Sequence, residues 1–181
     1  MSGAFNQWKW VAITVGSLLL GAILLVKFAP VPEGVEVGRR APDFSALNLA
    51  SGDSVRFAEE YAGQVTLVNI WATWCPPCRD EMPAMQELYD SLKSQGFRIA
   101  AISVDEGGLD EVRKFVSRFG LTFDILHDNS GRVDQRYQVT GYPESFLINR
   151  SGIIVKKVLS AHSWSSKTNR DVITHLLAGE S

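Results

Sequence analysis

The sequence predicts an α/β domain in which a mixed central sheet is flanked by helices. Two apolar patterns of strand length, at 64–71 and 97–104, alternate with amphipathic helical patterns, and this order is typical of parallel neighbouring strands. A turn signal at 150–152 then joins two further strands into an antiparallel hairpin. Residues 38–181 have about the length of one domain, so we expect one globular unit.

The other elements follow from the same periodicities. In chain order, the predicted elements are a small hairpin (43–49 and 54–57), a strand (64–71), a helix after residue 75, a strand (97–104), a helix (110–119), a short strand (121–126), a short helix (131–138), a hairpin (145–149 and 153–158) and a last helix (166–177). We expect the first hairpin (43–57) to be an N-terminal extension of the sheet, and the helix–strand pair at 110–126 to be a central insertion in it.

Residues 10–29 are predicted to form one transmembrane anchor, between a tail (1–9) and a linker (30–37). The run from Trp10 to Val26 is uncharged and mainly apolar, which places it at the short end of spanning lengths. A cleaved signal peptide is the alternative, but a cut after Ala29 would place Lys27 where a small residue is expected. A buried core helix is a third interpretation, which the polar linker disfavours. Flanking charges do not decide the orientation.

The composition excludes several classes of function. The formal net charge is −2, which argues against a basic nucleic-acid-binding protein. The only two cysteines, Cys75 and Cys78, are three positions apart, so a bridge between them would close a tiny loop and add little stability. A zinc site usually needs four ligands, and the three histidines are scattered. The cysteines are therefore expected to do redox chemistry without a metal or other cofactor.

The segment 71–78, Trp-Ala-Thr-Trp-Cys-Pro-Pro-Cys, follows a buried strand and opens a helix. A thiolate is the attacking species in disulfide exchange, and free backbone N–H groups at a helix N-terminus stabilise that anion. We therefore assign Cys75 as the exposed nucleophile and Cys78 as the more buried resolving cysteine. Trp74 is expected to cover the site and shape the surface that contacts a substrate.

The segment 140–146, Thr-Gly-Tyr-Pro-Glu-Ser-Phe, precedes the last hairpin. An X-Pro bond is the usual place for a cis peptide, and such a bend before Pro143 could present the backbone of Tyr142 to a substrate strand. Tyr142 and Pro143 are therefore candidate substrate-binding residues. Taken alone, the same segment is also compatible with an ordinary turn.

These motifs together resemble the TlpA/ResA/CcmG group of thioredoxin-like proteins. The resemblance rests on Trp-Cys-Pro-Pro-Cys (74–78), Gly-Tyr-Pro-Glu-Ser-Phe-Leu-Ile-Asn (141–149) and Gly-Arg-Arg-Ala-Pro-Asp-Phe (38–44). It implies a thioredoxin fold, a cis Pro143 and a thiol–disulfide oxidoreductase. It also implies a single-pass protein of the cell membrane, with its catalytic domain on the periplasmic or other extracytoplasmic side. Many relatives reduce apocytochrome c cysteines before haem attachment, with electrons from a membrane thiol carrier.

Two positions depart from ordinary thioredoxin. The buried acid six residues before its first cysteine is replaced here by Asn69, which cannot act as a carboxylate base. Glu81, three residues after Cys78, matches an acidic position of the ResA-like members, and one helical turn brings it near the resolving cysteine. Glu81 is therefore the candidate base for Cys78, and a solvated helix residue is the alternative.

Other functions stay open or are excluded. A disulfide oxidase uses the same reversible chemistry, and its direction depends on the reduction potential. A copper-handling Sco-type protein, or a reductant of one, is a second alternative, although those proteins use Cys-x-x-x-Cys and a distal histidine. A thiol peroxidase is excluded, because Ala72 occupies the hydroxyl position of its motif. An interaction module would leave the cysteine pair unexplained.

Overall fold

A computed structural model describes residues 3–28 and 34–179, with side chains from 8–21 and 34–179. The chain divides into two compact units, Met1–Glu33 and Gly34–Ser181. The first contains helix α1 (Gly3–Phe28), while the end of the predicted anchor at Ala29 and linker residues 30–33 lie outside the described residues. Within the described part of the chain, no helix combines the length and the apolar character needed to cross a membrane.

The second unit contains a seven-stranded mixed sheet in the order β2-β1-β5-β4-β3-β6-β7. Its strands are β1 (Ser45–Asn48), β2 (Ser54–Arg56), β3 (Val65–Trp71), β4 (Phe97–Ser103), β5 (Asp124–His127), β6 (Glu144–Ile148) and β7 (Ile154–Val158). Strands β3, β4 and β5 are parallel neighbours, and the other pairs are antiparallel. The predicted mixed sheet is confirmed, with hairpins β1–β2 and β6–β7 and with β5 as the strand of the central helix–strand pair.

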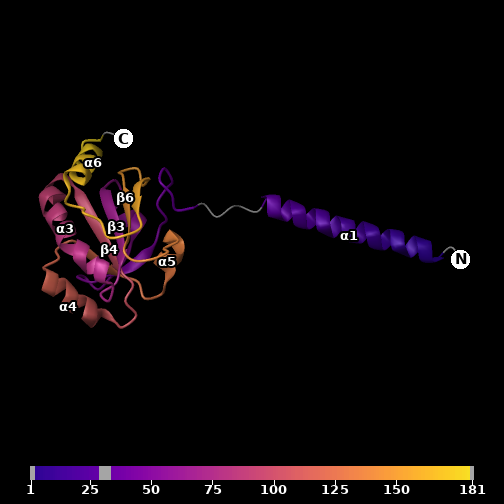
Figure 1. Cartoon of the computed structure of the whole chain (residues 1–181), viewed down its shortest axis with the longest axis horizontal. Coiled ribbons are helices and arrows are strands. Elements are labelled where there is room, and N and C mark those ends of the chain that lie inside the picture. The colour runs from indigo at the N-terminus through magenta and orange to yellow at the C-terminus, as the bar shows by residue number, and fades with distance from the viewer. Residues whose placement is uncertain (1–2, 29–33, 180–181) are drawn as a thin grey trace. The chain divides into compact units, whose positions relative to one another are not determined.

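Helices cover both faces of this sheet (Figure 1). Helices α3 (Pro76–Leu92), α4 (Leu109–Phe119) and α6 (Lys167–Leu177) pack on one face, and a short 3₁₀ turn (Lys93–Gln95) follows α3. The shorter helices α2 (Phe57–Glu60) and α5 (Arg132–Tyr137) pack on the other face. Each face buries its own apolar cluster, which is the layer arrangement that a two-sided sheet requires.

Strand β3 lies between β4 and β6 and is buried along its whole length. Because successive side chains of a strand point to opposite faces, Leu67, Asn69 and Trp71 share the face covered by α3, whereas Val68 and Ile70 belong to the other cluster. The polar Asn69 is therefore directed toward the helix that begins with the cysteine pair.

The structure differs from the sequence-based expectations at the edges of elements. The predicted strand 121–126 begins only at Asp124. Helix α4 ends at Gly120 in the left-handed conformation, and the N–H of Leu121 still bonds to Val116 of that helix. The apolar pattern at Leu121 and Phe123 therefore reflects burial in a loop. In addition, Val35, which the sequence placed in the linker, is buried in the domain.

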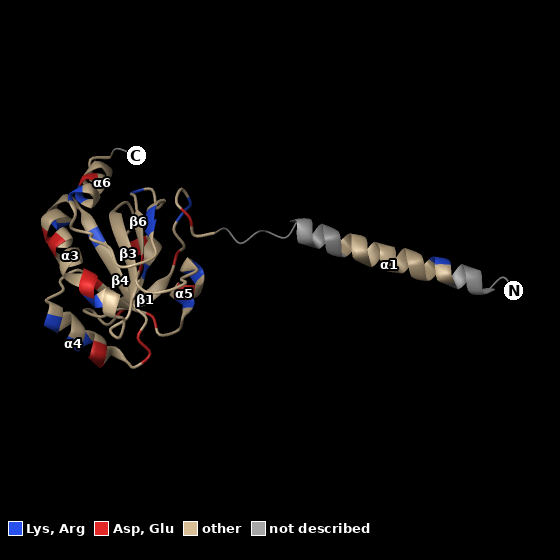
Figure 2. Cartoon of the chain, in the orientation of Figure 1, with Lys and Arg blue, Asp and Glu red and all other residues tan. Residues whose placement is uncertain are grey.

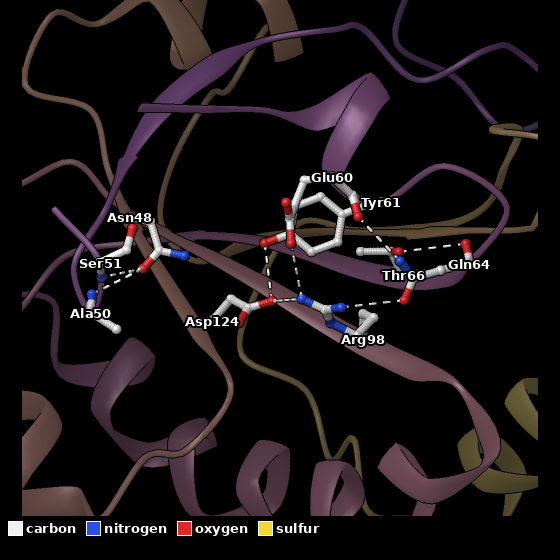
Figure 3. A network of polar contacts seen from close by, with 9 residues as sticks. All are labelled: Asn48, Ala50, Ser51, Glu60, Tyr61, Gln64, Thr66, Arg98 and Asp124. Carbon is white, nitrogen blue, oxygen red and sulfur yellow. Dashed lines mark hydrogen bonds and ion pairs between the residues drawn. The ribbon is translucent and has the colours of Figure 1, made fainter. Parts of the chain in front are cut away.

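A network of polar contacts holds α2 against the sheet far from the cysteines (Figure 3). Arg98 Nη2 lies 2.5 Å from Asp124 Oδ2, and the Tyr61 hydroxyl donates to the same oxygen at 3.1 Å. Arg98 is near the amino end of β4, whereas the cysteine pair follows the carboxyl end of the parallel strand β3. This network therefore lies at the opposite end of the parallel strands from the cysteine pair, and its role is structural.

Candidate active site

Cys75 and Cys78 form a disulfide at the start of α3. Strand β3 ends at Trp71, and Cys75 is the N-cap residue of α3, followed by Pro76 and Pro77 in its first turn. Proline is accepted there because its missing N–H is not needed. The Cys75 Sγ atom accepts the N–H of Cys78 at 3.2 Å. That donor and the helix dipole would stabilise a thiolate on Cys75.

The two cysteines differ in accessibility, although less than the sequence suggested. Cys75 is 4% exposed and Cys78 is fully buried. The neighbouring Trp74 is 63% exposed, so an aromatic side chain is open to solvent beside the disulfide. The difference between the two residues has the predicted sense, since Cys75 is the more accessible of the two.

The loop before the cysteines is held by Asp105, a residue that the sequence analysis missed. Both carboxylate oxygens of Asp105 accept the N–H of Thr73 at 3.1 Å, and the Thr73 hydroxyl donates to one of them at 2.5 Å. Ser103 also donates to Asp105, at 2.7 Å. A signal was available, since Asp105 follows the end of a strand parallel to β3 and so lies at the same edge of the sheet.

The Tyr142–Pro143 peptide bond is cis, which confirms that prediction. Strand β6 begins at the next residue, Glu144, and pairs antiparallel with β3, so the cis bend lies at the cysteine edge of the sheet. The Tyr142 ring contacts Trp74 edge to face, with 5.7 Å between ring centroids. The Tyr142 hydroxyl donates to Asp134. Trp74, Tyr142 and Pro143 therefore come together as predicted.

Two clefts of opposite charge meet at Trp74. One, of about 490 Å³, is lined by Thr73, Trp74, Tyr142 and five carboxylate residues: Asp105, Glu106, Glu111, Asp128 and Asp134. The other, of about 370 Å³, shares Thr73, Trp74 and Glu111 and adds Arg79, Lys114 and Arg118 beside Phe115 and Phe119. Figure 2 shows this mixture of charges along α4. Trp74 therefore lies between an acidic and a largely basic surface.

Glu81 is buried, with an exposed fraction of 3%, and is not the solvated helix residue of the alternative interpretation. Its Oε1 atom accepts from Asn69 Nδ2 at 2.7 Å, and its Oε2 atom accepts from the backbone N–H of His162 at 3.1 Å. Burial raises the pKa of Glu81 to about 7, although hydrogen bonding from Asn69, His162 and Trp164 opposes this shift. A carboxyl group with that pKa can both accept and donate a proton near neutral pH.

Two other carboxylate residues, Asp80 and Glu144, differ from Glu81 in their exposure or their contacts. Asp80 is exposed on α3, as expected for a position about a hundred degrees around the helix. Glu144, which the sequence analysis did not single out, is also buried. It accepts the N–H of Thr140 at 3.2 Å and pairs with Lys157 at 3.5 Å. Glu144 therefore stabilises the bend around the cis bond, whereas Glu81 lies on the face of α3 that contains Cys78.

No group of three or more His, Cys, Asp or Glu side chains is arranged to hold a metal ion within the described residues. The Cys75–Cys78 disulfide is itself a group that can be reduced and reformed. The fold also supplies the other parts of a disulfide-exchange site, namely a helix N-terminus, an exposed aromatic residue and a cis proline.

Comparisons with known proteins agree with this site. Residues 37–157 match the AhpC/TSA family. The chain is 40% identical over 175 residues to the thiol-disulfide oxidoreductase ResA of Geobacillus thermodenitrificans, covering 94% of this chain and 96% of that protein. It is 35% identical to the thioredoxin-like protein YneN of Bacillus subtilis, covering 81% and 86%. A solved thiol:disulfide interchange protein of Chlorobium tepidum is 26% identical, with a TM-score of 0.67 over 78% of this chain and 98% of that chain.

The fold and the cysteine site define a thiol–disulfide oxidoreductase of the thioredoxin fold, whose redox group is its own cysteine pair. The chain belongs to the AhpC/TSA family, and within it resembles the proteins named ResA. The resemblance drawn from the sequence motifs is thereby confirmed.

Proposed function

We propose that this oxidoreductase works as a reductase of disulfides in client proteins outside the cytoplasm, with apocytochrome c as the client. The exchange of disulfides with a client is supported by the position of Cys75, which caps α3 beside the exposed Trp74 and the cis Tyr142–Pro143 bend. A client strand can pair with the backbone at the bend while its disulfide meets the Cys75 sulfur.

The exchange consists of two displacements. The Cys75 thiolate attacks one sulfur of the client disulfide, forms a mixed disulfide and releases the other client sulfur as a thiolate. The Cys78 thiol loses its proton, and its thiolate attacks Cys75 Sγ and releases the second client sulfur. The client gains two electrons, which come from the two cysteines, and the protein ends as the Cys75–Cys78 disulfide seen here.

The second displacement requires a base, because Cys78 is fully buried and burial disfavours the thiolate. Glu81 follows Cys78 by one helical turn and is itself buried. With a pKa of about 7, its carboxylate can take the Cys78 proton and later return it to solvent or to a released client thiolate. Glu81 is the proposed general base of the resolution step.

The anchor belongs to the same proposal. Residues 10–29 hold the protein in the cell membrane as a single span, and the catalytic domain faces the periplasm or another extracytoplasmic side. The run from Trp10 to Val26 contains no charged residue, and the described middle of α1 is almost free of charge in Figure 2. A membrane thiol carrier then returns two electrons to the Cys75–Cys78 disulfide after each cycle.

Fractionation of the native cell checks the anchor. We expect the full chain in the membrane fraction, resistant to extraction by high salt, with its catalytic domain cleaved by protease added to spheroplasts. Apolar burial of a helix, unlike surface charge, is insensitive to salt. A shortened soluble product that begins near residue 30, or a domain protected from the protease, would contradict the proposal.

A trapping experiment checks the client. In a Cys78→Ser variant the mixed disulfide on Cys75 has no resolving sulfur, so the client stays attached and can be identified by mass spectrometry after non-reducing isolation. We expect apocytochrome c among the captured proteins. The matched control is the double variant Cys75→Ser, Cys78→Ser, which should capture none of them. Capture of a copper carrier in place of apocytochrome c would favour the alternative function as its reductant.

A further inference from the structure

The surroundings of Glu81 contain a buried amide that is only half used. Asn69 is fully buried on β3, and its Nδ2 atom donates to Glu81 Oε1 at 2.7 Å and to Ser145 Oγ at 2.9 Å. Ser145 is the residue directly opposite Asn69 on β6. The Oδ1 atom of the same amide accepts no hydrogen bond from any residue that the structure describes. No described residue on the Oδ1 side therefore fixes the amide in one orientation.

The hydrogen bonds around Glu81 in this structure are those of an ionised carboxylate. Both of its oxygens accept, one from Asn69 and the other from the backbone N–H of His162. When Glu81 takes a proton, one oxygen becomes a donor and would face another donor. The backbone N–H of His162 cannot reverse its role. An asparagine amide can, because a half-turn of its end exchanges Oδ1 and Nδ2.

We infer that Asn69 is a positioning residue that holds Glu81 in both protonation states, by donating to its carboxylate and turning over to accept from its acid. The proton is then directed to Oε1, the oxygen on the Asn69 side, while Oε2 keeps the His162 N–H. Ser145 can follow the change, because a hydroxyl group both accepts and donates. An aspartate or an aliphatic residue at position 69 could not serve both states. This inference rests on the proposed role of Glu81.

The other groups around Glu81 do not replace this function. On its own helix, Cys78 supplies the proton in the proposed resolution step. From the loop before α6, the ring of His162 contacts Lys156 at 3.1 Å and Asn169 at 3.4 Å. Lys156 also donates to Asn169, at 2.7 Å. The indole of Trp164 lies close to the Glu81 carboxylate, but its N–H makes no hydrogen bond of standard geometry with a described residue. Among these neighbours of Glu81, Asn69 is the one whose side chain can change from hydrogen-bond donor to acceptor.

The test uses the full-length chain in its disulfide form, in which no thiol titrates near Glu81. The ¹³C signal of the Glu81 carboxyl reports its protonation, and the side-chain ¹⁵N–¹H signals of Asn69 report the amide. We expect both sets of signals to change with one midpoint near pH 7. Neutron diffraction shows the deuterium atoms on Nδ2 and so distinguishes Nδ2 from Oδ1. It should show Oδ1 toward Glu81 at pH 5 and Nδ2 toward Glu81 at pH 9. One amide orientation at both pH values would overturn the inference.

Substitution gives a second, independent readout. Asn69→Leu has a similar volume and removes both the bond to the Glu81 carboxylate and the bond to its acid. Because the charge-assisted bond to the carboxylate is about twice as strong as the neutral one, the midpoint of Glu81 should still rise, by about one pH unit. Resolution at pH 7 should then fall about fivefold and approach the wild-type rate above pH 9, because the carboxylate fraction drops from half to roughly a tenth. Ser145→Ala, a milder change, should shift the midpoint in the same direction by less.

Thr66→Val is the matched control, because Thr66 is equally buried on β3 but points to the opposite face. It should leave the Glu81 midpoint unchanged, even if it lowers stability. An unchanged midpoint in both Asn69→Leu and Ser145→Ala would overturn the positioning role. If the midpoint moves while the exchange rate does not, the positioning role stands and the proposed role of Glu81 as a base fails.

Discussion

Cys75→Ser is expected to abolish disulfide reduction, with a loss of at least about 10³-fold, because the covalent route disappears with its nucleophile. Cys75 caps α3, where the N–H of Cys78 and the helix dipole favour a thiolate, and it is the more accessible of the two sulfurs. Reduction of a model disulfide by the reduced full-length chain, followed under single-turnover conditions, measures the loss.

The matched control is the same substitution three residues later. Cys78→Ser should keep the first displacement and stop at the mixed disulfide, so that one client sulfur is released and the other remains bound. Alkylation of the reduced wild-type chain at low pH should modify Cys75 first. Preferential labelling of Cys78, or reduction that survives in Cys75→Ser, would reverse the assignment of the two sulfurs.

Glu81→Gln is expected to slow the resolution step by about 10² at pH 8, the lower end of what a general base contributes. The substitution keeps size and burial but removes the base. With a pKa of about 7, wild-type Glu81 is a carboxylate in roughly a tenth of molecules at pH 6 and nine tenths at pH 8. The wild-type rate should therefore rise through pH 7, and the variant should lack this rise.

Stopped-flow tryptophan fluorescence between pH 5 and 9 can measure this step, because Trp74 adjoins the cysteine pair. Asp80→Asn is the control, since Asp80 is an exposed carboxylate on the same helix and should not affect the rate. Equal rates in Glu81→Gln and wild type across the whole range would remove Glu81 from the mechanism. The Cys78 proton would then pass to water or to another group.

The order and type of the elements could be predicted because each long element has a strong local pattern. The fully buried β3 and the amphipathic α4 are examples. Local patterns failed where burial occurs without regular structure, as at Leu121 and Phe123 before β5. They also failed for α2, which has only four residues and is stabilised by tertiary contacts of Phe57.

The candidate site could be predicted where its functional residues are close together in the sequence. The cysteine motif and the Tyr142–Pro143 segment are of this kind, and the position of Glu81 follows from helical spacing. The contacts of Asn69 with Ser145, and of Thr73 with Asp105, join residues 76 and 32 positions apart. Such pairs depend on strand register and order, which periodicity alone does not determine.

The buried Glu81 also links the folding equilibrium to protons. Its pKa is about 7 in the folded domain, against 4.5 for an ordinary glutamate. The folded state therefore binds more protons at Glu81 between these values, so the contribution of Glu81 to the free energy of unfolding is greatest below pH 4.5 and is lost as the pH rises through 7. The full difference is about 3 kcal/mol, a sizeable part of the stability of a domain of this size. At mildly acidic pH Glu81 is protonated and adds to the stability of the fold, whereas above pH 7 the carboxylate that is the proposed base is present at a cost in stability.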